Sequence, residues 1–199
     1  MSMIQPPPNS VHPLSRSLWR EWLAAHHERA DGVWLISYKK ATGKPRFDYD
    51  EAVEEALCFG WVDSKPNKLD QDRSMLWFAP RKSGTGWSRP NKERVERLFT
   101  MGLMHPAGLK KVEAAKADGS WSALDDVENL VIPSDLEAAL NTYANAAKYF
   151  REFPRSAKRG ILEWIAQAKT ESTRSKWVTE TATLADKNER ANQWLGRKK

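Results

Sequence analysis

The sequence predicts an α+β fold, in which an N-terminal region with a small, mostly antiparallel sheet and flanking helices is followed by a C-terminal helical module. Runs of β-branched and aromatic residues, which are typical of strands, all lie before residue 81. Beyond residue 133, apolar residues recur at helical spacing instead. The ten Trp and six Phe of this 199-residue chain supply enough apolar surface for a globular core, so we do not expect a disordered protein.

Capping residues and periodicity predict the first elements. Ser15 or Ser17 caps a helix that ends at Asp31, and residues 32–40 form a strand covered on both faces. A capping box of Asp48 and Glu51 then opens a second helix. That helix stops at Gly60, because glycine readily takes the left-handed conformation that ends helices.

The later elements follow from the same signals. They are strands 61–65 and 74–80 with a polar excursion at 66–73, a loop at 81–88, and helices 88–102, 106–119, 134–143 (with a capping box of Ser134 and Glu137), 156–169 and from Thr170 onward. The predicted organisation is a loose N-terminal arm at 1–14, an α+β domain at 15–121, a linker at 122–132, a helical module at 133–190 and a basic tail at 191–199.

The composition limits the cellular environment and the cofactors that we expect for this protein. The single cysteine, Cys58, excludes an internal disulfide and a multi-cysteine zinc site. The four histidines show no metal-ligand spacing, so we expect neither a metal nor another cofactor. The first residues lack a basic start and an apolar stretch, so no secretory signal is visible and a cytoplasmic location is expected. No apolar run approaches the length of a membrane-spanning helix.

The net charge of +6 is concentrated in two basic segments, 81–97 and 148–159. Such patches favour an anionic partner, although a solvated surface would look the same in sequence. One hypothesis is therefore nucleic-acid binding through the C-terminal helices. Its candidate residues are Lys148, Arg151, Arg155, Lys158, Arg159 and Arg174.

Two residues keep an enzymatic hypothesis open. Cys58 lies at the C-terminal end of a helix, where the helix dipole disfavours a thiolate, so a buried, inert thiol is the simpler interpretation. Asp63 falls inside a strand, where a carboxylate needs either a hydrogen-bond partner or a chemical task.

Aromatic and basic residues alternate around the hairpin and the following glycine loop. They can stack a ligand or grip an amphipathic peptide, or they can be core and cation–π scaffolding. Arg81 and the loop before Ser88 also make a possible anion-binding corner, against the alternative of an ordinary strand-to-helix loop. We predict one ligand-binding face composed of Trp61, Asp63, Lys65, Arg81, Trp87, Ser88 and Asn91.

Several linked motifs carry a family resemblance. They are Glu54-Glu-Ala-Leu-Cys-Phe-Gly-Trp-Val-Asp63, Phe78-Ala-Pro-Arg81, Trp87-Ser-x-x-Asn91 and Ile161-Leu-x-x-Ile-x-x-Ala-Lys169. With these motifs the chain resembles the YdeI/OmpD-associated family, also described as bacteriocin-protection proteins, from about residue 15 to residue 185. The resemblance implies protection against antimicrobial peptides or an association with an outer-membrane porin, and it brings no catalytic residue or cofactor with it.

The leading hypothesis is a non-enzymatic cytosolic ligand-binding or stress-protection protein that binds an anionic or amphipathic ligand. The alternatives are a nucleic-acid-binding protein, and an enzyme of unknown reaction that uses Asp63 or Cys58.

Overall fold

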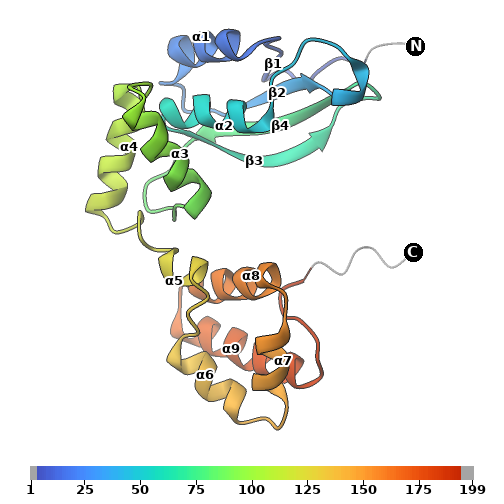
Figure 1. Cartoon of the computed structure of the whole chain (residues 1–199), viewed down its shortest axis with the longest axis vertical. Helices are drawn as coiled ribbons and strands as arrows, with labels where there is room; N and C mark the ends of the chain where they lie inside the picture. Colours follow the sequence, from blue (N-terminus) through green and yellow to red (C-terminus); the bar gives the residue numbers. More distant parts are fainter. Residues whose placement is uncertain (1–3, 194–199) are drawn as a thin grey trace. The chain divides into compact units, whose positions relative to one another are not determined.

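The computed structural model describes residues 4–193. The chain divides into two compact units, with the boundary between Ser122 and Ala123 (Figure 1). The first unit contains a four-stranded sheet and helices, and the second contains helices, which confirms the predicted α+β class. No helix in the described range is both long and apolar enough to cross a membrane.

The sheet has the order β1-β2-β4-β3. β1 runs parallel to β2, whereas β2 and β4, and β4 and β3, are antiparallel. The predicted hairpin is therefore confirmed, with a register shift between Asp63 and Pro66. The strands are β1 (Ser10–Val11), β2 (Val33–Tyr38), β3 (Trp61–Lys68) and β4 (Arg73–Pro80).

Two predictions about irregular segments are wrong. The N-terminal arm is held from residue 4 onward, because the Trp34 amide donates to the Asn9 carbonyl at 2.8 Å and Arg73 Nη2 donates to the Ile4 carbonyl at 2.8 Å. β1 pairs with the open edge of β2, whose backbone groups need partners. Half of the polar excursion at 66–73 is also strand, because residues 66–68 continue β3 and Arg73 begins β4.

The helices of the first unit are α1 (Arg16–His26), the short 3-10 helix η1 (Lys40–Thr42), α2 (Tyr49–Cys58), α3 (Arg89–Thr100) and α4 (Pro106–Ala117). Ser15 caps α1 by accepting a hydrogen bond from the Leu18 amide, although this helix ends earlier than predicted. The capping box of α2 is confirmed, and Glu51 accepts the Asp48 amide at 2.8 Å.

The core of the first unit lies between the helices and one face of the sheet (Figure 1). Trp19 of α1 and Ala56 of α2 are fully buried, and Leu35 and Phe78 meet them from the sheet. On the opposite face of the sheet, Trp34 and Trp77 are partners across the strands.

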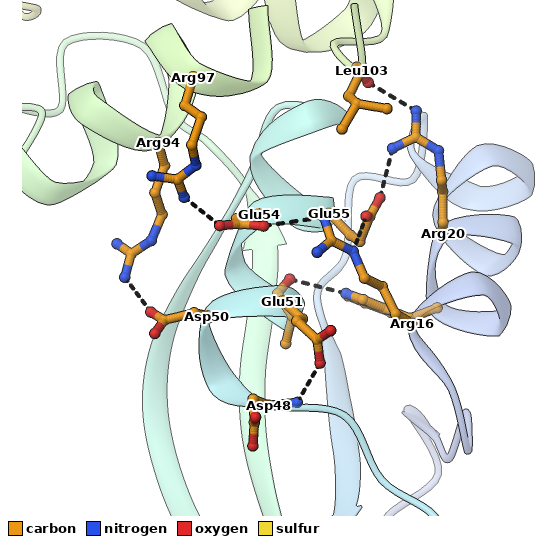
Figure 2. Close-up of polar contacts among 12 residues, drawn as sticks. Arg16, Arg20, Asp48, Asp50, Glu51, Glu54, Glu55, Arg94, Arg97 and Leu103 are labelled. Atoms are coloured by element: carbon orange, nitrogen blue, oxygen red, sulfur yellow. Dashed lines mark hydrogen bonds and ion pairs between the residues drawn. The ribbon is translucent and has the colours of Figure 1, made fainter. Parts of the chain in front are cut away.

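Charged residues of α2 connect this helix to α1 and α3 (Figure 2). Glu55 is only 3% exposed, and it accepts hydrogen bonds from Arg16 Nε and Arg20 Nη1, both at 2.6 Å. Arg20 also donates to the Leu103 carbonyl at 2.8 Å. The neighbouring Glu54 pairs with Arg16 and with Arg97 of α3. These contacts fix the positions of the three helices around the core.

The second unit packs five helices around its own core: α5 (Asp125–Glu128), α6 (Ser134–Asn141), α7 (Ala146–Glu152), α8 (Arg155–Ala166) and α9 (Glu171–Asp186). The predicted irregular linker at 122–132 is wrong, because it contains α5 with a buried Val127. The capping box at Ser134 is also absent, since Pro133 occupies the N-cap position. Thr170 does cap α9, by accepting the Thr173 amide. Residues 194–199 of the predicted tail lie outside the described range.

Candidate functional site

The predicted binding face does not converge on one cavity. Trp61 is 1% exposed, and its Nε1 donates to the His27 carbonyl at 3.1 Å, so its indole belongs to the core. Lys65 is exposed on β3. Ser88 occupies the N-cap position of α3, and Asn91 accepts a hydrogen bond from Arg94 at 3.0 Å. These residues therefore serve separate structural roles.

The Arg81–Trp87 pair forms, but it is buried. The guanidinium carbon of Arg81 lies 3.8 Å from the centroid of the Trp87 ring, and both residues are almost fully buried. Arg81 Nη2 donates to the carbonyls of Thr85 and Gly86. The glycine loop therefore folds back onto the Arg81 guanidinium group. Burial lowers the pKa of Arg81 to about 10.

The space beside this pair is too small for a ligand. The void next to Arg81 has a volume of about 10 Å³, which is room for a single water molecule. The structure therefore fills the predicted anion-binding corner with the protein's own side chains and loop carbonyls. Sequence proximity of a cation and an aromatic ring did not distinguish a binding surface from a buried cation–π pair.

Among the predicted binding residues, Asp63 lines a cavity of ligand size. This cavity, which we call the sheet cavity, has a volume of about 610 Å³ and lies where the start of α2 faces β2, β3 and β4. Its apolar lining includes Leu35, Phe47, Ala52, Met75 and Leu76, and its cationic lining is Lys39, Lys40 and Arg46.

A tyrosine satisfies the Asp63 carboxylate. The Tyr49 hydroxyl donates to Asp63 Oδ2 at 2.9 Å. Burial, together with this hydrogen bond to a carboxylate, raises the pKa of Tyr49 to about 12. At neutral pH the Tyr49 hydroxyl is therefore protonated and donates to Asp63. Such a pair forms a fixed hydrogen bond rather than transferring a proton.

The three cations of the sheet cavity are held in different ways. Lys39 donates to the carbonyls of Asp70 and Gln71, which anchors it to the turn between β3 and β4. Arg46 pairs with Asp48 at 2.9 Å. Lys40 is exposed at the rim. An apolar floor with cations at the mouth is an arrangement that accommodates an amphipathic molecule with an acidic group.

Lys40, Arg46 and Phe47 were not predicted as cavity residues, because Lys40 was placed at the end of the strand 32–40 and no motif was recognised at residues 46 and 47. The available signal was Phe47, an aromatic residue in an otherwise polar stretch, which is 7% exposed. A buried aromatic residue just before a capping box indicates a loop that packs onto the sheet rather than one that extends into solvent.

The structure does not support Cys58 as a nucleophile. Its side chain is fully buried, and burial raises the pKa of the thiol to about 11. The reactive species of a cysteine is the thiolate, which is therefore almost unpopulated at neutral pH. Burial and the raised pKa of the thiol therefore give no support to an enzymatic role of Cys58.

We expect iodoacetamide to leave Cys58 unmodified in the folded protein at neutral pH and to alkylate it rapidly in denaturant. The reason is that both access and ionisation require the core around α2 to open. Intact-mass spectrometry over a time course measures the modification. Native-state alkylation at the rate of the unfolded chain would show that the thiol is accessible after all.

The basic patch of the second unit is partly neutralised within the fold. Arg159 pairs with Glu128 and Glu163, and Arg174 pairs with Asp135. Arg155 donates to the Glu128 carbonyl. Of the other three patch residues, Lys148 and Arg151 are exposed, and Lys158 Nζ donates to the Arg151 carbonyl at 3.0 Å. Four of the six predicted phosphate-contact residues are therefore engaged in contacts within the second unit.

Among residues 4–193, no group of three or more His, Cys, Asp and Glu side chains is arranged to hold a metal ion. The sheet cavity accordingly offers hydrogen bonds, cations and apolar surface as its means of recognition.

Comparisons with known families agree with the division into two units. Residues 11–111 match a family model described as a domain of unknown function (DUF8412). Residues 129–188 match the family model described as bacteriocin-protection, YdeI or OmpD-associated, which confirms the resemblance for the C-terminal unit. No curated protein and no solved structure matches the chain. The chain therefore belongs to the DUF8412 family, whose model matches its N-terminal region, and its residues 129–188 are similar to the family described as bacteriocin-protection, YdeI or OmpD-associated.

Proposed function

We propose that the protein is a non-enzymatic binding protein with a role in protection against antimicrobial peptides, and that it binds an amphipathic, anionic ligand in the sheet cavity. The observation that carries the proposal is the combination, in one cavity of about 610 Å³, of an apolar floor with three cations at its border. The protective role derives from the family description of residues 129–188.

The size and lining of the cavity favour a small or medium ligand. Ligand sites commonly have volumes of about 300–1,000 Å³ and are mostly apolar with a few polar groups that fix orientation. Here Leu35, Leu76 and Phe47 supply apolar surface, while the Tyr49–Asp63 pair supplies an oriented polar edge. A ligand with a hydrocarbon or aromatic body fits that surface.

The charge at the border favours an acidic group on the ligand. Lys39, Lys40 and Arg46 outnumber the carboxylates of Asp48 and Asp63, and Asp63 already has a hydrogen-bond donor in Tyr49. An anionic head group near Lys40 gains electrostatic attraction, and its apolar body stays out of water.

Anilinonaphthalene sulfonate, a fluorescent amphipathic anion, tests this proposal, with the uncharged phenylnaphthylamine as its matched comparison. We expect saturable fluorescence enhancement with the anionic dye. The Lys40→Glu variant should weaken its affinity about fivefold while leaving the affinity for the neutral dye nearly unchanged. The two dyes together separate the contribution of the head group from that of the apolar body.

Lys65→Glu is the control, because Lys65 is exposed on β3, makes the same charge change and does not line the sheet cavity. Equal weakening by both variants would assign the effect to overall charge rather than to this cavity. Absence of saturable binding to either dye would overturn the proposal.

A further inference from the structure

A second cavity, which we call the histidine cavity, lies at the start of α4 and has a volume of about 590 Å³. It shares no lining residue with the sheet cavity. The end of α1, the turn after α2, the end of β4 and the first turns of α4 all contribute to it. Its lining residues are His27, Glu28, Arg29, Phe59, Gly60, Pro80, His105, Pro106, Ala107, Lys110 and Lys111.

The lining of this cavity is strongly basic. Arg29, Lys110 and Lys111 face a single acidic residue, Glu28, which is exposed. The rings of His27 and His105 lie 4.8 Å apart in an edge-to-face arrangement. Cations from two separate segments thus line one cavity. Together they make the electrostatic potential inside the cavity positive.

Two of the cations, Lys110 and Lys111, lie in the N-terminal half of α4. The N-terminus of a helix carries a partial positive charge, so acidic residues are normally favoured there. The first turn of α4 has no acidic residue, and Lys110 and Lys111 follow within the next turn. The two lysines thus add positive charge to the partial positive charge of the helix start, and both favour an anion in the cavity.

Two further contacts prepare the cavity for an oxyanion. His105 Nδ1 accepts the Ala107 amide at 3.2 Å, so the neutral ring carries its proton on Nε2 and can donate a hydrogen bond. Burial, with the neighbouring His27 and Arg20, lowers the pKa of His105, which favours the neutral ring. Phe59 stacks against the His105 ring and adds an apolar wall.

Lys111 is placed by a specific backbone feature. Gly60 has a φ of +77°, and a Cβ at this position would lie 2.8 Å from Lys111 Cγ. The glycine that ends α2 therefore lets the Lys111 stem lie against the turn, next to the cavity.

We propose that the histidine cavity binds a phosphate group, either as free inorganic phosphate or as the monoester of a small molecule. This site goes beyond the proposed function, since it is a different cavity with a different chemistry. The cations and the His105 donor recognise the phosphate oxygens, and Phe59, Pro80 and Pro106 provide surface for an apolar substituent on the ester.

Titration of the full chain with inorganic phosphate, and separately with phenyl phosphate, tests the proposal. The NMR signals of the His27 and His105 rings report binding directly. We expect saturable shifts of both rings at millimolar phosphate or below. Tighter binding of phenyl phosphate would identify an ester as the preferred form, and equal or weaker binding would identify free phosphate.

Lys110→Gln removes an exposed cation of the cavity and should weaken phosphate binding about fivefold. Lys116→Gln makes the same change on the same helix, away from the cavity, and should have little effect. Unperturbed histidine signals at saturating phosphate, or unchanged affinity in Lys110→Gln, would overturn the assignment.

Discussion

Replacing Gly108 with alanine is expected to destabilise the first unit by about 3 kcal/mol or more. A Cβ at this position would lie 2.2 Å from the Cys58 carbonyl oxygen and 2.8 Å from the Leu57 carbonyl oxygen. Both are backbone atoms at the end of α2, so no side-chain rotation can relieve the overlap. α4 would have to move away from α2, and the hydrogen bond from the His105 amide to the Cys58 carbonyl would break.

Gly160 provides the matched control, because it also lies inside a helix, α8, and an added Cβ there has no heavy atom within 4 Å. Gly160→Ala should therefore stabilise the second unit by about 0.5–1 kcal/mol, the usual gain from replacing a helical glycine. The two substitutions should change stability in opposite directions. This difference separates the effect of the close approach of α4 to α2 from the effect of helix propensity.

Urea unfolding monitored by hydrogen exchange assigns each transition to its unit, which matters because the chain consists of two compact units. Wild-type stability in Gly108→Ala would mean that the two helices are not in contact at this point. Destabilisation by Gly160→Ala would instead indicate that helix-interior glycines in this protein share some other requirement.

Local features of the fold could be predicted from the sequence, because their physical causes lie within a few residues. The cap at Ser15 and the capping box of Asp48 and Glu51 each involve a side chain and an amide three positions away. The last helix was predicted to begin near Thr170, and this residue caps it over the same separation. The hairpin of β3 and β4 was likewise visible from two apolar runs flanking a polar segment.

Features that depend on distant partners could not be predicted. β1 is defined by its pairing with β2, more than twenty residues later. α5 is only four residues long, and its Glu128 gains its partner from Arg159 of α8. Neither contact leaves a periodic pattern in the sequence, which is why both segments looked irregular.

The candidate site illustrates the same limit. Arg81 and Trp87 were correctly associated, but their burial depends on how the glycine loop folds back onto the guanidinium. Asp63 was singled out because a carboxylate in a strand needs a partner. That partner, Tyr49, comes from the start of α2. The sequence could indicate the need for a partner but not its identity.

Glu55→Ala is expected to be the most destabilising of the carboxylate substitutions on α2, with a loss of about 2–3 kcal/mol. The Glu55 side chain is 4% exposed and accepts from both Arg16 and Arg20 (Figure 2). Removing one partner of a fully buried pair costs about 3–5 kcal/mol. We expect less here because the side chains of Arg16 and Arg20 are 33% and 35% exposed and can turn toward water.

Two other carboxylates on the same helix make a graded control series. Glu54 is 13% exposed and pairs with Arg16 and Arg97, so Glu54→Ala should cost about 1 kcal/mol. Asp50 is 69% exposed, so its pair with Arg94 should contribute about 0.5 kcal/mol or less. Equal losses in all three variants would attribute the effect to the change in helix charge rather than to burial.

Salt distinguishes these contributions further, because mobile ions screen exposed pairs much more than buried ones. The loss of stability in Asp50→Ala should disappear in high salt, while that in Glu55→Ala should largely remain.

A double-mutant cycle between Glu55→Ala and Arg20→Ala isolates the interaction energy of Glu55 and Arg20, which we expect to exceed the corresponding value for Asp50 and Arg94. Because Arg20 also donates to the Leu103 carbonyl, the loss of Glu55 should loosen the loop before α4 together with the α1–α2 contact. Faster hydrogen exchange at both places, with the second unit unchanged, is the signature of this coupling.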